Sequence, residues 1–498
     1  MTFRRHSHSL EFGIQALFRF RGFEFRCSNS THRRKWFLLA LPLLCFLPST
    51  AFSAERPNII FLLTDDMGYG DTGCYGGNFV PTPNIDELAK EGTKFTQFYV
   101  AAPVCSPSRV GYLTGMFPGR WRITNYLQTR AGNRASEQAD FLDTNAPSIG
   151  RALKAAGYAT GHFGKWHMGG GRDVTNAPPF SAYGFDEHAG TWESPEPDPN
   201  LTATNWIWSA FDNVKRWNRT AYFVDKTLDF LSRHKGQPCY VDLWPDDVHT
   251  PWVPEASTHE AHPRAHYENE KNFKAVLAEY DKQVGRLIAG LQELGLESNT
   301  IIIFASDNGP LPTLGGARTG GLRGAKDSLY EAGTREPLIV RWLGQVPAGR
   351  VDGQTVIGGV DFLPMFCRLA GAPRPKAQTL DGEDLSRAFF GHSVSRKAPL
   401  FWEYGRNGTF GYPMETPDER SPNVAIREGK WKLLVNADGS DAQLYDLDAD
   451  QHETTNVAVK NSAVAKRLTD MALKWRKSLP GGIQEMKGAG GAQVAPDS

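Results

Sequence analysis

Two short apolar runs that each end in a pair of polar residues constrain the fold of this chain most strongly. Residues 58–63 (NIIFLL) lead to Asp65-Asp66, and residues 300–304 (TIIIF) lead to Asp307-Asn308. Runs of this kind are typical of strands that are buried on both faces of a parallel sheet. Because ligands bind beyond the carboxyl ends of such strands, the sequence predicts an α/β fold with a site at that edge.

Strand and helix patterns alternate along most of the chain. Residues 158–163 read as a strand that leads to Lys165 and His167, and residues 239–244 as a strand that leads to His249. Polar residues thus follow four predicted strands at the same edge. Helices are predicted from apolar spacing, caps and glycine stops at residues 83–89, 149–156, 272–294 and 361–369.

The pattern changes after about residue 397. Short strand segments at 423–427, 431–435 and 443–447 are separated by turn residues, and a helix is predicted at 463–477. We expect a small antiparallel sheet with a terminal helix over residues 398–480. Residues 481–498 are rich in Gly and Ala and are expected to be disordered.

The first 54 residues differ from the rest. Eight basic residues precede an apolar run at 36–47, which is too short to span a bilayer, and small residues follow at 49–54. This order predicts a secretory signal region at 1–54 and a protein that is exported to the periplasm or secreted. A short anchor that stays attached is the alternative, and the long basic segment also fits a start site that is placed too early.

Charge balance limits the partners. Lys and Arg together number 55, as do Asp and Glu, so the formal net charge is zero. Nothing global therefore indicates a nucleic-acid partner or a membrane surface, and we expect no stable membrane insertion.

The polar pairs at the two strand ends offer hard oxygen ligands. The carboxylates of Asp65, Asp66 and Asp307 with the amide oxygen of Asn308 suit an octahedral or larger cage for Ca²⁺, with Mg²⁺ as the alternative. Each pair alone fits equally well a turn or a helix N-cap, where Asp and Asn are common.

Residues 105–109 (CSPSR) are followed by VGYLTG at 110–115. A lone cysteine in a proline-containing turn is usually a buried structural thiol. Pro107 favours a turn that presents Cys105, and Arg109 lies one helical turn further on. C-x-P-S-R followed by L-T-G resembles the signature of the type I sulfatases, in which a dedicated enzyme oxidises the cysteine to Cα-formylglycine before or during export.

The resemblance covers residues 57–457 and includes GKWH at 164–167, DVHTPW at 247–252 and RGAK at 323–326. The sequence EAG at 331–333 stands where the family usually has EGG. The resemblance implies an alkaline-phosphatase-like sandwich: a large central mixed, mostly parallel sheet flanked by helices in a catalytic domain at 55–397, before the small C-terminal unit. With Cys105 converted, three cysteines remain beyond the signal region, which does not indicate a disulfide framework.

The resemblance also implies a role for each site residue. Ca²⁺ would be held by Asp65, Asp66, Asp307 and Asn308, with an oxygen of the converted Cys105 or of sulfate completing the coordination. Lys165, Lys326 and His249 would bind sulfate, Arg109 would stabilise the hydrated aldehyde, and His249 with Lys326 would protonate the leaving oxygen. Asp307 would accept a proton from the attacking hydroxyl, and His167 one from the second hydroxyl, which expels sulfate.

We therefore expect hydrolysis of a sulfated carbohydrate or an aryl sulfate, with the formylglycine-generating enzyme as a maturation partner. Trp192, Trp206, Trp208 and Trp217 could stack on sugar rings, or could equally be core residues of a long insertion. One rival function is a phosphodiesterase or phosphonate hydrolase of the same superfamily. The other is a silent binder of sulfated glycans in which Cys105 stays a thiol, although such a binder does not need the acid and base that His249 and His167 offer.

Overall fold

A computed structural model describes residues 56–201, 212–255, 267–376, 379–405 and 420–481. Residues 54–498 form one compact unit, separate from residues 1–53. The predicted signal region, Trp206, Trp208 and the predicted tail from residue 482 onward lie outside the described residues.

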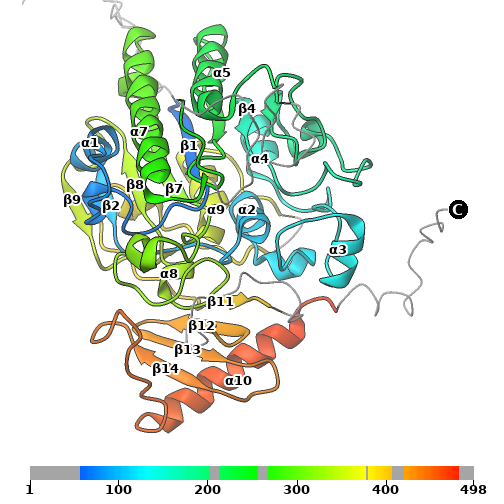
Figure 1. The fold of residues 1–498 in the computed structure, drawn as a ribbon, viewed down its shortest axis with the longest axis vertical. Helices are drawn as coiled ribbons and strands as arrows, with labels where there is room; N and C mark the ends of the chain where they lie inside the picture. Colours follow the sequence, from blue (N-terminus) through cyan, green and yellow to red (C-terminus); the bar gives the residue numbers. More distant parts are fainter. Residues whose placement is uncertain (1–55, 202–211, 256–266, 377–378, 406–419, 482–498) are drawn as a thin grey trace, which may run out of the picture. The chain divides into compact units, whose positions relative to one another are not determined.

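A mixed eight-stranded sheet forms the centre of this unit (Figure 1). Neighbouring strands from β5 to β7 are parallel, whereas β8 is antiparallel to both β7 and β2. In spatial order the strands are β5 (Glu187–Gly190), β4 (Ala159–Gly164), β6 (Cys239–Trp244), β1 (Asn58–Thr64), β7 (Thr300–Ser306), β8 (Leu338–Arg341), β2 (Thr93–Phe95) and β9 (Arg350–Asp352). The predicted mostly parallel sheet is confirmed.

Helices cover both faces of the sheet. Alternate residues of its central strands point to opposite sides, and because these residues are apolar, each face has to be buried. Ile60 and Leu62 belong to one core cluster, and Ile59, Phe61 and Leu63 to another. The first cluster includes residues of α1 (Pro83–Glu91), α5 (Arg219–Arg233) and α7 (Glu270–Glu293). The second includes residues of α2 (Cys105–Thr114), α4 (Ile149–Ala155) and α9 (Phe362–Leu369).

Local capping explains where the helices begin. The Ser148 side chain accepts a hydrogen bond from the Arg151 amide at the start of α4, as the sequence predicts. Asn269 caps α7 in the same way, so this helix begins two residues before the predicted start at 272. Three further helices were not predicted. Helices α3 (Arg130–Ala135) and α8 (Glu331–Thr334) are too short for their apolar spacing to reveal. Helix α5 is long enough, and its buried Phe223, Phe230 and Leu231 have helical spacing, so the signal was present and was missed.

A four-stranded antiparallel sheet follows, made of β11 (Leu400–Glu403), β12 (Val424–Glu428), β13 (Trp431–Val435) and β14 (Gln443–Asp446). Helix α10 (Ser462–Ser478) packs on it through Ala465, Leu468 and Ala472. The predicted small sheet with a terminal helix is confirmed, with β11 as an additional strand. We call the eight-stranded sheet with its helices the large unit. The Trp402 indole joins the small sheet to it by donating a hydrogen bond of 2.8 Å to the Val100 carbonyl. Val100 follows β3 (Phe98–Tyr99), which pairs with β10 (Ile357–Gly358).

A buried charge cluster also joins the small sheet to the large unit. Lys432 Nζ on β13 lies 2.9 Å from Glu331 on α8 and 3.1 Å from Glu453. The Tyr99 hydroxyl donates to the other oxygen of Glu331 at 2.6 Å. Burial alone would raise the pKa of Glu331, but Lys432, Arg335 and Arg427 outweigh it and lower that pKa, whereas burial and Glu331 raise the pKa of Glu453.

The four cysteines that the structure describes are unpaired, in agreement with the expectation of no disulfide framework. Among the described helices, none is both long and apolar enough to cross a lipid bilayer.

Candidate active site

Four neighbouring parallel strands deliver their polar residues to one edge of the sheet. Because β4, β6, β1 and β7 are adjacent and parallel, the segments that follow them meet. The residues that the sequence analysis selected gather here, and every one is at least nine-tenths buried: Asp65, Asp66, Cys105, Arg109, Lys165, His167, His249, Asp307, Asn308 and Lys326.

The backbone at this edge adopts conformations that ordinary residues rarely take. Gly164 has φ of +131°, and a Cβ there would lie 1.9 Å from the Trp244 carbonyl oxygen, which instead accepts a 2.7 Å hydrogen bond from the Lys165 amide. Asp66 and His167 have φ of 59° and 52°, in the left-handed region. Such positions concentrate at functional sites, where the surrounding structure holds them.

Lysines neutralise the two carboxylates that follow β1. Lys165 Nζ lies 2.7 Å from Asp65 Oδ2, and Lys326 Nζ lies 2.6 and 2.8 Å from the two oxygens of Asp66. Burial alone would raise the pKa of Asp65, but Lys165, His249 and Arg109 outweigh it and hold that pKa well below its usual value. Both carboxylates are therefore ionised at neutral pH.

Arg109 neutralises the third carboxylate. Its Nε and Nη2 donate to Asp307 Oδ2 at 3.0 and 2.7 Å, and its Nη1 donates to the Lys165 carbonyl at 2.8 Å. Burial and the nearby Asp65 raise the pKa of Asp307 to about 6, even though Arg109 opposes them. Asp307 is thus the carboxylate of the three that takes up a proton most readily.

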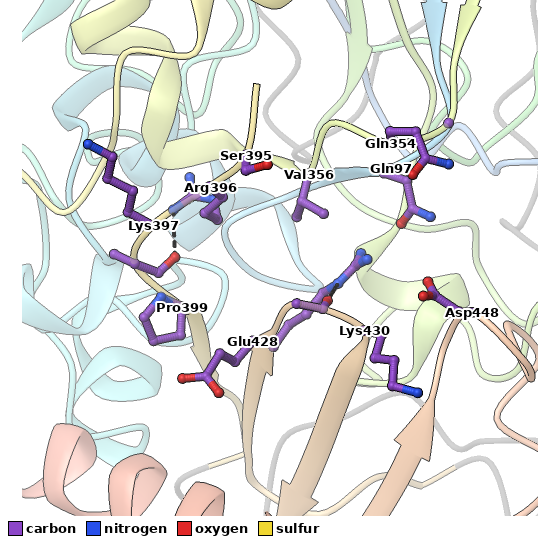
Figure 2. Close-up of a pocket in the computed structure, with 14 residues that line it drawn as sticks. Gln97, Gln354, Val356, Ser395, Arg396, Lys397, Pro399, Glu428, Lys430 and Asp448 are labelled. Carbon is purple, nitrogen blue, oxygen red and sulfur yellow. Dashed lines mark hydrogen bonds between the residues drawn. The ribbon is translucent and has the colours of Figure 1, made fainter. Parts of the chain in front are cut away.

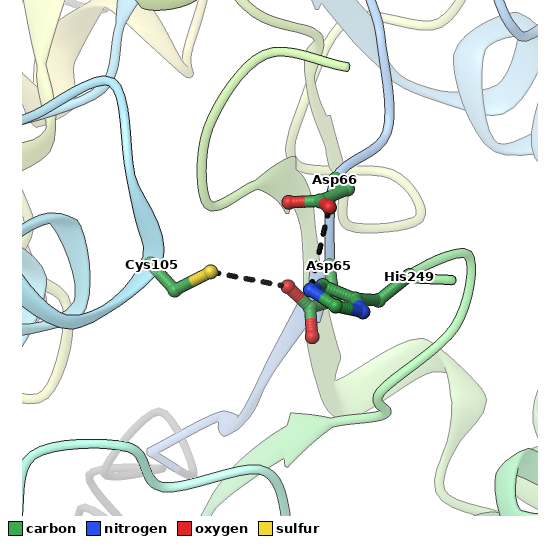
Figure 3. A group of neighbouring side chains, drawn as sticks. All are labelled: Asp65, Asp66, Cys105 and His249. Atoms are coloured by element: carbon green, nitrogen blue, oxygen red, sulfur yellow. Dashed lines mark hydrogen bonds and ion pairs between the residues drawn. The ribbon is translucent and has the colours of Figure 1, made fainter. Parts of the chain in front are cut away.

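Cys105 is the first residue of helix α2, and its side chain faces the carboxylates (Figure 3). Its Sγ lies 3.4 Å from Lys165 Nζ and 3.6 Å from Asp65 Oδ1, and the residue is 2% exposed. Burial raises the pKa of the Cys105 thiol well above its usual value, and Lys165 offsets only part of this effect. An unmodified Cys105 is therefore a thiol at neutral pH.

The donor atoms at this edge fit a hard divalent cation. One oxygen each from Asp65 and Asp66, the sulfur of Cys105 and a ring nitrogen of His249 lie within 4.8 Å of one another. Asn308 Oδ1 is buried and accepts no hydrogen bond from any described residue, and Asp307 Oδ1 accepts one from the Asp66 amide. Oxygen donors of this kind are the ligands that Ca²⁺ and Mg²⁺ prefer, and an orphaned buried acceptor is costly unless a cation or donor meets it.

A backbone carbonyl fixes the tautomer of His167. Its Nε2 lies 3.1 Å from the Leu127 carbonyl oxygen, so Nε2 carries the proton. Nδ1 is buried and forms no hydrogen bond with the residues that the structure describes. The Leu127 amide is itself held by the Ser106 hydroxyl at 2.9 Å. Burial lowers the pKa of His167 to about 3, so the ring is neutral and its Nδ1 lone pair is available to accept a proton.

His249 faces the carboxylates with its other nitrogen. Its Nδ1 donates to the Thr250 carbonyl at 2.6 Å, and its Nε2 lies 3.5 Å from Asp66 Oδ2 (Figure 3). Burial lowers the pKa of His249 to about 4, although Asp66 and Asp65 favour the charged form.

Comparison with known proteins agrees with this geometry. A family model described as sulfatase matches residues 57–372, and one described as N-sulphoglucosamine sulphohydrolase, C-terminal, matches residues 325–478. Human arylsulfatase A is 32% identical over 424 residues, which are 80% of this chain and 78% of that protein. The chain belongs to the sulfatase family. It is a sulfuric ester hydrolase.

Two further relatives of this sulfatase are informative. An N-acetylgalactosamine-6-O-sulfatase of Bacteroides thetaiotaomicron is 29% identical over 505 residues, which are 84% of this chain and 93% of that protein. The solved structure of Ps i-CgsB in complex with k-i-k-neocarrahexaose has a TM-score of 0.67 and 27% identity, over 84% of this chain and 93% of that one.

A cavity of about 230 Å³ opens onto the site of this sulfatase. It is lined by Val104, Cys105, Tyr126, Gln128, Lys165, His167, Arg172, Glu193, His249 and Lys326. Five of these were not predicted from the sequence: Val104, Tyr126, Gln128, Arg172 and Glu193. Arg172 follows three glycines after the GKWH segment, which could have drawn attention to it. No sequence signal marks Glu193, whose carboxylate accepts from Arg172 at 2.7 Å and lies 3.6 Å from His167 Nε2.

The Arg109 contacts predict that Arg109→Lys destabilises the folded sulfatase. The lysine keeps the charge but cannot supply all three hydrogen bonds, so Asp307 and the Lys165 carbonyl lose buried donors. We expect a loss of about 2–5 kcal/mol in the free energy of unfolding. Thermal denaturation would measure it, with Arg467→Lys as the matched control, because Arg467 pairs with Glu428 at the surface. Equal melting temperatures for the two variants would contradict the expectation.

Proposed function

We propose that this sulfatase hydrolyses a sulfate ester of a carbohydrate by means of a formylglycine formed from Cys105, with Ca²⁺ bound beside it. One observation carries the proposal. A single cavity collects Cys105, the two lysines 165 and 326, and the two histidines 167 and 249. This set combines a reactive position with cations for an anionic group and with a proton acceptor and donor.

The state of the Cys105 side chain favours conversion over direct use of the thiol. A nucleophilic cysteine needs a lowered pKa, whereas burial raises the pKa of this thiol. The hydrated aldehyde would supply one hydroxyl that attacks sulfur and a second hydroxyl whose deprotonation releases sulfate.

The cationic residues bind and orient the sulfate group. Lys165 and Lys326 line the cavity, and their ammonium groups face the oxygens that sulfate brings. His249 lines the same cavity, and Asp66 and Asp65 favour its protonated form, in which Nε2 carries a proton while Nδ1 stays bonded to the Thr250 carbonyl. This Nε2 proton is the one that His249, together with Lys326, donates to the leaving oxygen. Arg109, fixed by Asp307, stabilises the side chain at position 105 from the buried side.

Two residues move protons at this position. Asp307, whose pKa is raised to about 6, accepts the proton of the attacking hydroxyl. His167 accepts the proton of the second hydroxyl at Nδ1, because its Nε2 is committed to the Leu127 carbonyl. Glu193, beside that ring, favours the protonated form that His167 then adopts.

A divalent cation would be held by Asp65, Asp66, Asp307 and Asn308. Its charge would stabilise negative charge on the sulfate oxygens and on the side chain at 105. Lys165 and Lys326 keep the carboxylates of Asp65 and Asp66 ionised, which is the form that binds metal.

The relatives favour a sulfated sugar as the substrate class. One is named an N-acetylgalactosamine-6-O-sulfatase, and another was solved in complex with k-i-k-neocarrahexaose. Trp192 lies beside the cavity-lining Glu193 and stacks with Arg172, with 5.4 Å between the guanidinium carbon and the ring centroid. A polymeric sulfated carbohydrate outside the cell fits the predicted export. The formylglycine-generating enzyme completes the set of proposed partners.

Replacement of Cys105 tests the proposal directly. We expect Cys105→Ala to lose turnover of sulfate esters completely while the melting temperature stays near that of the wild type, because alanine removes the reactive group and little volume. A peptide mass spectrum across residue 105 of the native protein should show the aldehyde. Undiminished hydrolysis by the alanine variant, or an unmodified cysteine in fully active protein, would sink the formylglycine mechanism.

Removal of the metal is the second test. Chelation should lower kcat at least tenfold, because the carboxylate cluster would lose the cation that offsets its charge, and added Ca²⁺ should restore it. Elemental analysis of the chelated sample provides the control. Full activity in demonstrably metal-free protein would show that the assignment of Ca²⁺ is wrong.

The role of His249 predicts a dependence on the leaving group. His249→Gln should reduce kcat for a sugar sulfate by about 10²–10⁴-fold, because an alkoxide needs protonation as it leaves. The loss for 4-nitrophenyl sulfate should be much smaller, because nitrophenolate leaves readily without a proton. His188→Gln, at a partly exposed histidine outside the cavity, is the matched control. Equal losses for both substrates would exclude His249 as the acid.

A further inference from the structure

A second cavity, of about 250 Å³, lies where the small sheet meets the large unit (Figure 2). Its walls come from Gly353, Gln354 and Val356, from residues 395–399, from the end of β12 and the following turn at 427–430, and from Gln97 and Asp448. It shares no lining residue with the cavity at Cys105. Its lining includes four cationic side chains and two carboxylates, so positive charge is in excess.

Arg427 is the unusual member of this lining. The residue is 4% exposed, and its guanidinium carbon lies 4.4 Å from the centroid of the Tyr99 ring. Its Nε donates to the Gly429 carbonyl at 3.3 Å, whereas its Nη1 is buried and has no hydrogen-bond partner in the part of the chain that the structure describes. No carboxylate of the described residues forms an ion pair with it. A buried guanidinium without a paired anion is costly.

The nearest carboxylates are already committed to other groups. Glu331 accepts from Lys432 and from the Tyr99 hydroxyl, and Glu453 accepts from Lys432 and from the Glu331 amide at 2.6 Å. With Arg335, which lies 3.5 Å from Glu331, this buried cluster holds three cations and two carboxylates. Arg427 favours the ionised form of Glu331 without forming an ion pair with it, so the cluster keeps an excess of positive charge at the residue that also lines the cavity.

Other polar atoms in the lining fit a bound oxyanion. Arg396 has a side chain that is 7% exposed, and its guanidinium pairs with Asp361 and lies 3.7 Å from Glu383. Its Nε is nevertheless buried and has no hydrogen-bond partner among the described residues. The remaining charges are used elsewhere: Glu428 pairs with Arg467 at 2.5 Å and Lys430 pairs with Asp446 at 2.5 Å. Figure 2 shows the ammonium group of Lys397 at the upper left and that of Lys430 at the lower right of the residues drawn. The other two cations of the lining are the guanidinium groups of Arg396 and Arg427.

We propose that this cavity is a second anion-binding site, in which Arg427 and Arg396 hold a sulfate or carboxylate group apart from the cavity at Cys105. Planar guanidinium groups bind such oxyanions in preference to neutral ligands. The anion has two candidate sources with the same chemistry: a charged group of a sulfated polysaccharide, or free inorganic sulfate.

Anomalous diffraction with selenate as the sulfate probe tests the site. In crystals of the full chain soaked in selenate, we expect a selenium peak in the cavity beside Arg427. Arg427→Met should lower its occupancy at least tenfold at a fixed selenate concentration, because charge-assisted hydrogen bonds are lost. Arg467→Gln, which alters an exposed arginine on the outer side of Glu428, should keep the peak.

Two further measurements complete the test. If Arg427→Met does not fold, Arg427→Lys replaces it as the test variant. Lysine keeps the charge but lacks the paired N–H donors of the guanidinium, so it should also reduce the occupancy of the selenate. A soak with a chondroitin 6-sulfate hexasaccharide separates the sources: sugar density in the cavity indicates a glycan, and an undisturbed selenium peak indicates a free ion. An empty wild-type cavity, or a peak that Arg427→Met and Arg427→Lys leave unchanged, overturns the proposal.

Discussion

Charge neutralisation at the ends of β1 and β7 is the constraint on which the rest of the site depends. Asp65, Asp66 and Asp307 are fully buried, and an isolated buried carboxylate would be far too costly to keep ionised. Each one therefore has its own cation, brought by a different element: Lys165 after β4, Lys326 from the loop after β7, and Arg109 from α2. The site and the fold are thus held by the same ion pairs.

The sheet, most of the helices over its two faces and the small C-terminal sheet were predicted from the sequence, because each leaves a local signal. Helix α5 leaves such a signal too but was not predicted. The continuous apolar runs of β1 and β7 are typical of strands that are buried on both faces of a parallel sheet. The capping residue Ser148 marks the start of α4. Strands of two to four residues, such as β3, β8 and β10, were not predicted. They are too short to show alternation, and their positions are set by their neighbours in space.

The ten predicted site residues were also within reach of the sequence, since they lie in motifs and at strand ends, and the structure brings them together. Glu193 and Gln128 were missed because only tertiary contacts bring them to the cavity. The carbonyl of Leu127, which fixes the tautomer of His167, is a backbone group that no side-chain pattern can reveal. Arg427 reads in the sequence as an ordinary strand residue. That no carboxylate of the described residues forms an ion pair with Arg427 can be seen only from its neighbours in the structure.

Because Cys105 is buried in the folded protein, another protein can modify its side chain only before helix α2 has packed. The residue begins α2 and is 2% exposed beneath Lys165 and Asp65, so a second enzyme cannot reach its sulfur once the helix has packed. The proposed conversion of Cys105 would therefore compete with folding, and its extent would depend on the ratio of the two rates. A substitution that accelerates packing of α2 would therefore yield a more rapidly folded but less completely matured population, even if the final structure were identical.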